Sequence, residues 1–345
     1  MATIEDILKL IYTLTSVEQA ELKTVLLNSK SKANGIEELV YDERFTGGLV
    51  CPVCGCVGHV VTNGHRKDGK QRFLCKDCDK SFVSNTNSIT SGTKKGLDIW
   101  MKYIECMING MPLRESASIY KIHRNTAFMW RHKVLDALQK ITEDINLSGI
   151  IEADETFFPI SYKGNHKKSS FKLPRIVHKR GKSTHTRGLS SEQVCVPCAL
   201  DRNGNSISKI SNLGRIKTKD LHSVFDGKIE EKATLCTDKM NSYVRFANSN
   251  KIQLVQLKTG KSKKGIYHIQ HINAYHGKLK KFMKRFNGVA TKYLNNYLLW
   301  NILLNVKEGS LSDKVINLLR KVAATFTTIK SRSLSSRPAI PLPIA

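Results

Sequence analysis

The sequence predicts a mixed α/β fold preceded by a small cysteine-rich ribbon and a group of short helices. From Gly149 onward, short apolar runs alternate with segments of helical periodicity, which is the pattern of a sheet with flanking helices. Before that point, two Cys-x-x-Cys pairs enclose a glycine-rich stretch, and helical segments joined by short turns follow. A chain of 345 residues, 40% of them apolar, has room for two or three such domains.

The N-terminal segment has apolar residues at helical spacing over residues 4–27, which predicts a helical hairpin. Residues 28–46 are polar and are expected to form a linker. We therefore expect residues 1–46 to be one unit, made of the hairpin and its linker.

The paired cysteines predict a zinc ribbon over residues 47–88. Cys51 and Cys54 form the first pair and Cys75 and Cys78 the second, with 20 residues between the pairs. Two such turns on facing hairpins present four thiolates to one tetrahedral ion. Four thiolates leave no position for water, so the zinc is expected to be structural. Cys56 lies nearby and is interpreted as a bystander.

The helical segments over residues 93–147 predict a helix-turn-helix module. A helix expected over residues 113–120 is followed by a short break and a second helix over residues 124–141. Polar and basic side chains on this second helix are candidates for contacts with base edges, and a plain helical bundle with a charged surface is the alternative. The candidate DNA-binding residues here are Arg124, Asn125, Thr126 and Arg131.

The α/β domain is expected over residues 148–308, followed by a C-terminal helix and a disordered tail over residues 309–345. Its strands are expected over residues 149–157, 193–200, 206–210, 233–237 and 253–257. Its helices are expected over residues 218–225, 242–249, 269–285 and 293–306. The tail from Ser331 is rich in Ser and Pro, a composition typical of disorder.

The charge of the chain indicates a polyanionic partner. It carries 56 Lys and Arg against 29 Asp and Glu, a net charge of +27, and DNA or RNA is the usual partner for such a surplus. The longest apolar stretch, Tyr297 to Val306, is interrupted by asparagines and is too short to span a membrane. Without a recognisable signal peptide, the protein is expected in the cytoplasm, associated with a bacterial nucleoid.

Acids at the ends of apolar runs predict a metal centre. Asp154 is expected to end a strand of the α/β domain, with Glu152 two residues earlier on the same face, and Asp238 is expected to end a later strand. Two such acids and a third oxygen ligand can hold a divalent metal against a phosphate. A solvated acid at Asp154 and a helix cap at Asp238 are the alternatives.

The chain resembles the zinc-ribbon group of bacterial insertion-sequence transposases, the ISXO2-like family, which have an RNase H-like nuclease domain of the DDE type. The resemblance extends from the ribbon to about Trp300. The residues that carry it are Glu152–Thr156, Lys163–Asn165, Lys182, Arg187–Ser190, Val194–Asp201, Thr237–Asp238 and His268–Trp300.

This resemblance implies that Asp154, Asp238 and Asn273 bind two catalytic Mg²⁺ or Mn²⁺ ions and that Lys280 assists them. Many family members have Glu at the third position, and a subgroup has Asn followed by Lys, the form that Asn273 and Lys280 resemble. Asn offers one neutral oxygen, so Glu152 and Glu155 are candidates to supply the missing charge. His276, three residues after Asn273, is interpreted either as an assistant to the metal or as an ordinary helix histidine.

The implied function is that of a DNA transposase that cuts element ends and transfers the strands. Its partners are double-stranded DNA, both the terminal inverted repeats and the target, and further copies of the chain. The alternatives are an inactive DNA-binding protein, acting as a repressor or a domesticated element protein, and a nuclease acting on RNA or branched DNA. Further phosphate contacts are expected from basic segments that flank the metal residues, with Lys167, Lys168, Arg187 and Lys281 as the candidate residues.

Overall fold

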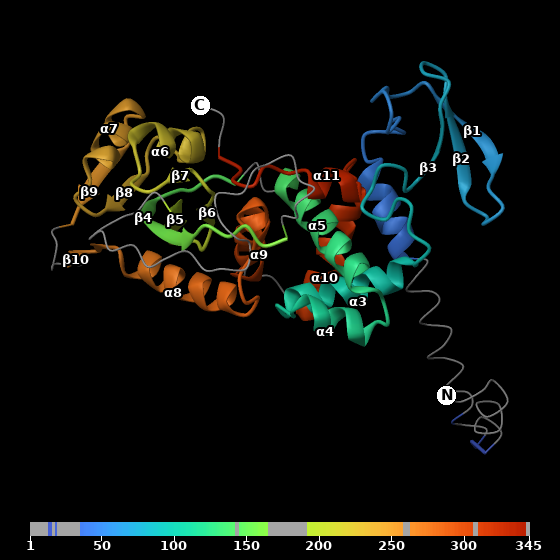
Figure 1. Ribbon diagram of the computed structural model, residues 1–345. Coiled ribbons are helices and arrows are strands. Elements are labelled where there is room, and N and C mark those ends of the chain that lie inside the picture. Colours follow the sequence, from blue (N-terminus) through green and yellow to red (C-terminus); the bar gives the residue numbers. More distant parts are fainter. Residues whose placement is uncertain are drawn as a thin grey trace. The chain divides into compact units, whose positions relative to one another are not determined.

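The computed structural model describes residues 13–15, 18, 35–141, 145–164, 192–257, 263–305 and 310–342. The chain forms two compact units (Figure 1). One consists of Met1–Ile104 with Leu311–Phe326, and the other of Glu105–Ser310 with Thr327–Ala345. Most of the expected N-terminal hairpin lies outside the described residues, and so does the basic segment that holds Lys167, Lys168 and Arg187. The five domain ranges expected from the sequence remain predictions.

A three-stranded antiparallel sheet forms the ribbon of the first unit. Its order is β1 (Val60–His65), β2 (Gln71–Cys75) and β3 (Ser81–Val83). The β1–β2 turn closes through a hydrogen bond from the Arg66 N–H to the Lys70 carbonyl, and Gly69 takes a φ of +79° there, which favours glycine. Phe73 and Phe82 pack beside the cysteines with ring centroids 5.5 Å apart. So small a core needs a further source of stability, which a metal ion held by the cysteines would supply.

Residues 35–44, expected to be part of a linker, are helical instead. Ile36 and Phe45 are buried, and Arg44 is only 5% exposed. The Arg44 guanidinium lies 4.1 Å from the ring centroid of Phe326 and donates to the carbonyls of Ala323 and Thr325. Arg44 thereby joins this helix to the end of α10 (Leu311–Ala324). The polar composition concealed these tertiary contacts.

The helices of the predicted helix-turn-helix module are present as separate elements. Helix α3 (Leu97–Ile108) runs across the division between the two units, and α4 (Leu113–Ile119) and α5 (Arg124–Ile141) belong to the second. Lys121, in the turn between α4 and α5, has a φ of +46°, which lets the chain reverse within four residues.

A mixed sheet forms the centre of the second unit. The strands β4 (Ile150–Pro159), β5 (Gln193–Asp201), β6 (Ser206–Ser208), β8 (Thr234–Thr237) and β9 (Gln253–Gln256) take the order β6-β5-β4-β8-β9, and β7 (Asn212–Leu213) pairs with β5. β5 is antiparallel to β4, and β6 is antiparallel to β5, whereas β8 and β9 run parallel to β4. This is the RNase H-like mixed sheet expected from the sequence.

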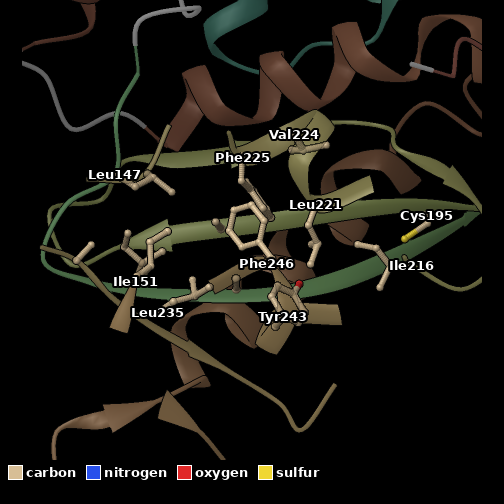
Figure 2. Close-up of a cluster of buried hydrophobic side chains, with 14 residues drawn as sticks. Leu147, Ile151, Cys195, Ile216, Leu221, Val224, Phe225, Leu235, Tyr243 and Phe246 are labelled. Carbon is tan, nitrogen blue, oxygen red and sulfur yellow. The ribbon is translucent and has the colours of Figure 1, made fainter. Parts of the chain in front are cut away.

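Helices cover the two faces of this sheet (Figure 1). One face carries α6 (Thr218–Phe225) and α7 (Asn241–Ser249), and α8 (Gln270–Lys284) lies along the other. Figure 2 shows the core beneath α6 and α7, where Leu221, Phe225 and Phe246 pack on Ile151 and Leu235 of the sheet. A small hairpin, β10 (Lys263–Lys264) and β11 (Tyr267–His268), precedes α8 and was not expected from the sequence.

The C-terminal part of the second unit packs onto its helices. A 3₁₀ turn, η2 (Thr291–Tyr293), leads into α9 (Leu294–Asn305), and α11 (Ser331–Ser335) returns to this region. The Tyr293 hydroxyl donates to the Leu334 carbonyl at 3.3 Å, Leu334 is 1% exposed, and Arg337 pairs with Asp136. The disorder expected from Ser331 is therefore wrong for residues 331–342, because an apolar anchor and an ion pair hold them. Within the described residues, no helix is both long and apolar enough to cross a bilayer.

We expect a buried histidine to make the second unit sensitive to acid. His132 of α5 is fully buried between Phe128 and Tyr293, and burial lowers its pKa to about 3. The unfolded value is near 6.5, so protonation favours the unfolded chain, and the contribution of the neutral form is lost as the pH falls from about 6.5 towards 3. Between pH 7.5 and 5, urea unfolding should show a loss of about 2 kcal/mol, at ~1.4 kcal/mol per pH unit.

The variant His132→Phe keeps an aromatic ring in this site but cannot be protonated. Its free energy of unfolding should change less between the two pH values than that of the wild type. Equal losses in both proteins would show that other groups cause the acid sensitivity.

Candidate metal and nucleic-acid sites

Two acids of the second unit face each other across adjacent parallel strands. Glu152 of β4 pairs with Cys236 of β8, and continuing this register by two residues places Asp154 opposite Asp238. Neighbouring strands lie about 4.8 Å apart, and residues two apart point to the same face. The two carboxylates therefore converge at the point where the parallel pairing ends. One detail of the prediction is corrected, because Asp154 lies within β4, which continues to Pro159, and only Asp238 follows a strand end.

Asp238 does not cap the helix that follows it. Helix α7 begins at Asn241, with Met240 at the N-cap position. The Oδ1 atom of Asp238 is buried and has no hydrogen-bond partner. Gln256 holds the loop in place by donating from Nε2 to the Asp238 carbonyl at 3.2 Å. A buried acceptor without a donor is costly unless something else binds it, and a cation meets that need.

Helix α8 lies on the face of β4 that carries Asp154. The Nδ1 atom of its His276 lies 3.7 Å from Oδ2 of Asp154. Burial and the charge of Lys280 lower the pKa of His276 to about 4, so this ring is neutral at pH 7. Asn273 and Lys280 are exposed and lie one turn before and one turn after His276. His276 thus lies beside Asp154, and Asn273 and Lys280 lie on the same side of the helix as His276.

Burial and like charge destabilise the ionised acids of this site. Burial raises the pKa of Asp154 to about 6, the charge of Asp238 raises it further, and Lys280 opposes the shift. Burial and the charges of Asp154 and Asp238 raise the pKa of the neighbouring Glu155 to about 7, and burial also raises that of Asp238. Three acids that repel one another are typical of a site that binds a cation.

Glu155 and Glu152 point to opposite faces of β4 and have different surroundings. Glu155 shares its face with Ile151 and Ala153 and interacts with the Tyr243 hydroxyl at the edge of the core (Figure 2). Its Oε1 atom is buried without a hydrogen-bond partner. Both oxygens of Glu152 are instead engaged by α8 and Arg202. Of the two candidates to supply missing charge, Glu152 is therefore excluded by its contacts.

The cysteines of the first unit form a cluster that can hold a metal ion. The Sγ atoms of Cys51 and Cys78 lie 3.7 Å apart, and those of Cys54 and Cys75 lie 3.6 Å apart. Cys56 is also part of the cluster, with its Sγ 3.1 Å from that of Cys75. The sequence interpretation of Cys56 as a bystander did not anticipate this contact.

The spacing of the sulfur atoms distinguishes two possible ligand sets. Ligands about 2.3 Å from a tetrahedral zinc ion lie about 3.8 Å from one another. The distances between Cys51 and Cys78 and between Cys54 and Cys75 match two edges of such a tetrahedron. The shorter distance from Cys56 to Cys75 does not. The geometry favours the four cysteines of the two pairs over a set that contains Cys56.

The candidate DNA-binding residues have different surroundings. Arg124 and Asn125 are exposed at the start of α5, Thr126 is half-buried, and Lys281 is exposed on α8. Arg131 is 1% exposed, lies 4.4 Å from the Trp300 ring centroid and donates to the Met111 carbonyl. The prediction of a DNA contact is therefore wrong for Arg131, because a buried guanidinium cannot reach a base. The remaining candidates, Lys167, Lys168 and Arg187, lie outside the described residues.

Arg202 is a residue of this site that sequence reasoning missed. It follows β5 in a polar turn and contacts Glu152, His268 and His271, which lie 50 to 69 residues away in the chain. A turn arginine gives no local signal of such partners.

Comparison with known proteins finds matches for part of the second unit. Residues 146–299 match the model of the ISXO2-like transposase domain. An uncharacterised protein in the transposable element ISH50 of Halobacterium salinarum is 21% identical over 258 residues, which are 74% of this chain and 84% of that protein. This part of the chain is therefore a transposase domain. The domain is similar to that of the ISXO2-like transposases, the family that the sequence motifs indicated.

Other matches are shorter or weaker. Adenylate kinase of Clostridium kluyveri is 33% identical over 72 residues, which are 21% of this chain and 31% of the kinase. Two solved structures also match, a pre-cleavage Mos1 transpososome and the Mos1 mariner paired end complex with Mn. They are 9% and 10% identical, cover 64% and 68% of this chain and 75% and 77% of those chains, and have TM-scores of 0.20 and 0.24.

Proposed function

We propose that this transposase binds the ends of an insertion sequence and cuts and transfers DNA strands with divalent metal ions. Asp154, Asp238 and Asn273 would hold the ions, and Lys280 would contact a phosphate. The observation that carries the proposal is the closeness of Asp154 and Asp238, which lie two residues beyond the paired Glu152 and Cys236 and influence each other electrostatically, with an unpartnered oxygen on Asp238. Oxygen ligands of this kind suit Mg²⁺ and Mn²⁺.

Some residues of the site would bind the metal ions, and others surround or influence the carboxylates. Bound there, a pair of ions would activate the attacking water or 3′-hydroxyl and stabilise the departing 3′ oxygen. His276, neutral and buried beside Asp154, keeps water from that side of the carboxylate. Asn273 brings no charge, so Glu155 is the remaining acid near enough to influence both aspartates. The paired Cys-x-x-Cys set would hold a structural Zn²⁺.

Basic surfaces support DNA as the partner. The chain carries a net charge of +27, and the exposed side of α8 carries four lysines and no acid: Lys278, Lys280, Lys281 and Lys284. Lysines beside a metal centre attract the phosphates on which that centre would act. Binding should weaken steeply as salt rises, since each neutralised phosphate releases counterions.

Substitutions of two arginines of α5 should distinguish a role in DNA binding from a role in folding. Arg124→Ala removes an exposed cation and should weaken DNA binding several-fold and reduce its salt dependence, while leaving the free energy of unfolding within about 0.5 kcal/mol. Arg131→Ala removes a buried side chain and leaves the Met111 carbonyl without its donor, so it should cost about 2–4 kcal/mol. Fluorescence anisotropy and urea unfolding measure the two effects, and the opposite assignment would contradict the model.

A cleavage assay tests the proposed function. The zinc-loaded protein is incubated with end-labelled DNA carrying the terminal repeats of the element, with Mg²⁺ or Mn²⁺. We expect a metal-dependent nick at the element end and joining of the freed 3′ end to plasmid DNA. Tight binding without cutting under both metals would instead support an inactive DNA-binding protein. Cutting without joining, on any branched substrate, would indicate a nuclease.

A further inference from the structure

The most heavily engaged side chain beside the metal site is the Glu152 carboxylate, which is 1% exposed. Its Oε2 atom accepts hydrogen bonds from the backbone N–H groups of His271 and Ile272, at 2.8 and 3.0 Å. Its Oε1 atom lies 2.9 Å from Nη2 of Arg202 and 3.1 Å from Nδ1 of His268. A single acid thus joins β4, the turn after β5, and the start of α8.

These bonds replace the N-terminal cap that α8 lacks. Ile269 stands at the N-cap position and has no polar side chain to offer. The first N–H groups of any helix need acceptors, and a negative charge at that end is stabilising. Glu152 of β4, 119 residues away in the chain, supplies both the acceptor and the negative charge.

Arg202 orients this carboxylate and the rings around it. Its Nη1 donates to Nε2 of His268 at 2.9 Å, and its Nη2 donates to the Ile266 carbonyl at 3.3 Å. His268 then carries its proton on Nδ1 and donates it to Glu152, so one neutral tautomer serves both contacts. The hairpin that ends at His268 is thereby attached to the same carboxylate.

A metal ion is a competing occupant of this cluster, because Glu152, His268 and His271 offer ligand atoms within 4.8 Å of one another. The observed bonds argue against it. The Arg202 guanidinium carries a permanent positive charge in contact with all three residues. The Nε2 lone pair of His268 is occupied, and Oε2 of Glu152 accepts two backbone hydrogen bonds. A cation would have to displace this arginine.

We propose that Glu152 and Arg202 are positioning residues that fix the first turn of α8 on β4 and so set the place of Asn273 relative to Asp154. Asn273 follows directly after the two residues whose N–H groups Glu152 holds, and Asp154 lies two residues after Glu152 on the same face of β4. A shift of about 1 Å in a ligand of a reacting centre lowers rates about a hundredfold. This inference rests on the proposed function, since it assigns Asn273 to the metal centre.

The test uses full-length, zinc-loaded protein with Mn²⁺ alone as the probe. Hydrogen exchange of a peptide covering residues 270–276 reports the first turn of α8, and calorimetry reports the Mn²⁺ dissociation constant. Glu152→Ala should accelerate exchange in this peptide and weaken Mn²⁺ binding at least about tenfold, the effect typical of losing a residue that orients a ligand. Glu152→Gln keeps one acceptor oxygen and should restore part of both properties. Arg202→Ala should show a smaller loss of the same kind, and the exposed control Glu231→Ala should show none.

Two results would overturn the proposal. The first is faster exchange in Glu152→Ala with a Mn²⁺ dissociation constant within twofold of the wild type, which makes the cap merely structural. The second is a lower number of Mn²⁺ ions bound in His268→Ala or His271→Ala, which makes the cluster a metal site.

Asp154→Ala separates this inference from the proposed function. It should abolish the Mn²⁺ binding that Glu152→Ala weakens and leave exchange in residues 270–276 unchanged. If Asp154→Ala binds Mn²⁺ normally, the metal centre of the proposed function fails, and with it the role of Glu152 in placing Asn273. If Asp154→Ala abolishes Mn²⁺ binding but Glu152→Ala leaves it unchanged, only the positioning role of Glu152 fails.

Discussion

Asp154→Asn should abolish strand cleavage and, in metal-free buffer, stabilise the protein. The substitution removes one of the two facing carboxylates, and the loss of several kcal/mol of transition-state stabilisation lowers the rate at least ~10³-fold. Burial and the charge of Asp238 raise the pKa of Asp154 to about 6, above its unfolded value near 4, so its ionised form at pH 7 disfavours folding. Removing that charge should add about 1–2 kcal/mol, or a few degrees in Tm.

Gel-based cleavage assays and thermal unfolding with and without Mn²⁺ measure the two effects of Asp154→Asn. Mn²⁺ should raise the Tm of the wild type and leave that of the variant unchanged, because only the wild type binds the ion. The exposed acid Glu231 provides the control, since Glu231→Gln should change neither property. A variant that still cuts DNA, or that loses stability without metal, would show that Asp154 has a structural role and not a catalytic one.

Removal of zinc should unfold the ribbon, residues 51–83. Its core consists of Phe73 and Phe82 beside the cysteines, and zinc binding to such small domains supplies about 10–16 kcal/mol. Cys75→Ser should lose both the zinc and the protection of the ribbon against hydrogen exchange. Cys56→Ser should keep both, because the distance of Cys56 from Cys75 does not fit the tetrahedron. Metal analysis with exchange of peptides from β1 and β2 measures the outcome.

The reverse outcome for the cysteines would reassign the ligands. If Cys56→Ser loses the zinc and Cys78→Ser retains it, the ligand set is Cys51, Cys54, Cys56 and Cys75, whose ligand atoms all lie within 4.8 Å of one another.

Much of the second unit could be predicted from the sequence because its elements have strong local signals. The expected helix over residues 269–285 is α8, Gln270–Lys284, and the expected strand over residues 193–200 is β5, Gln193–Asp201. Both have clear apolar periodicity and polar boundaries. Two neighbouring strands that each carry an acid late in an apolar run predict that Asp154 and Asp238 lie close together, and each is affected by the other's charge or by burial in the structure.

What sequence reasoning missed depends on contacts between distant residues. Arginine is a residue type that often contacts DNA, but Arg131 lies beside Trp300 and is buried. The helix over residues 35–44 is held by contacts of Arg44 with the end of α10, which is nearly 280 residues away. Glu152 occupies a position that suggests a metal ligand, and only its bonds to His271 and Ile272 show that it caps a helix. The role of a polar side chain depends on its tertiary contacts, which the local sequence pattern does not predict.

Locating the bound metal along the chain tests the central claim most directly. Fe²⁺ is substituted for Mn²⁺ in the zinc-loaded protein, and hydroxyl radicals generated at the ion cut the nearby backbone. If Asp154, Asp238 and Asn273 hold the ion, mass spectrometry should find cuts around residues 154, 238 and 273, and excess Mg²⁺ should suppress all three together. Cuts confined to the ribbon, or a pattern that leaves residues 154 and 238 intact, would contradict the proposed metal centre.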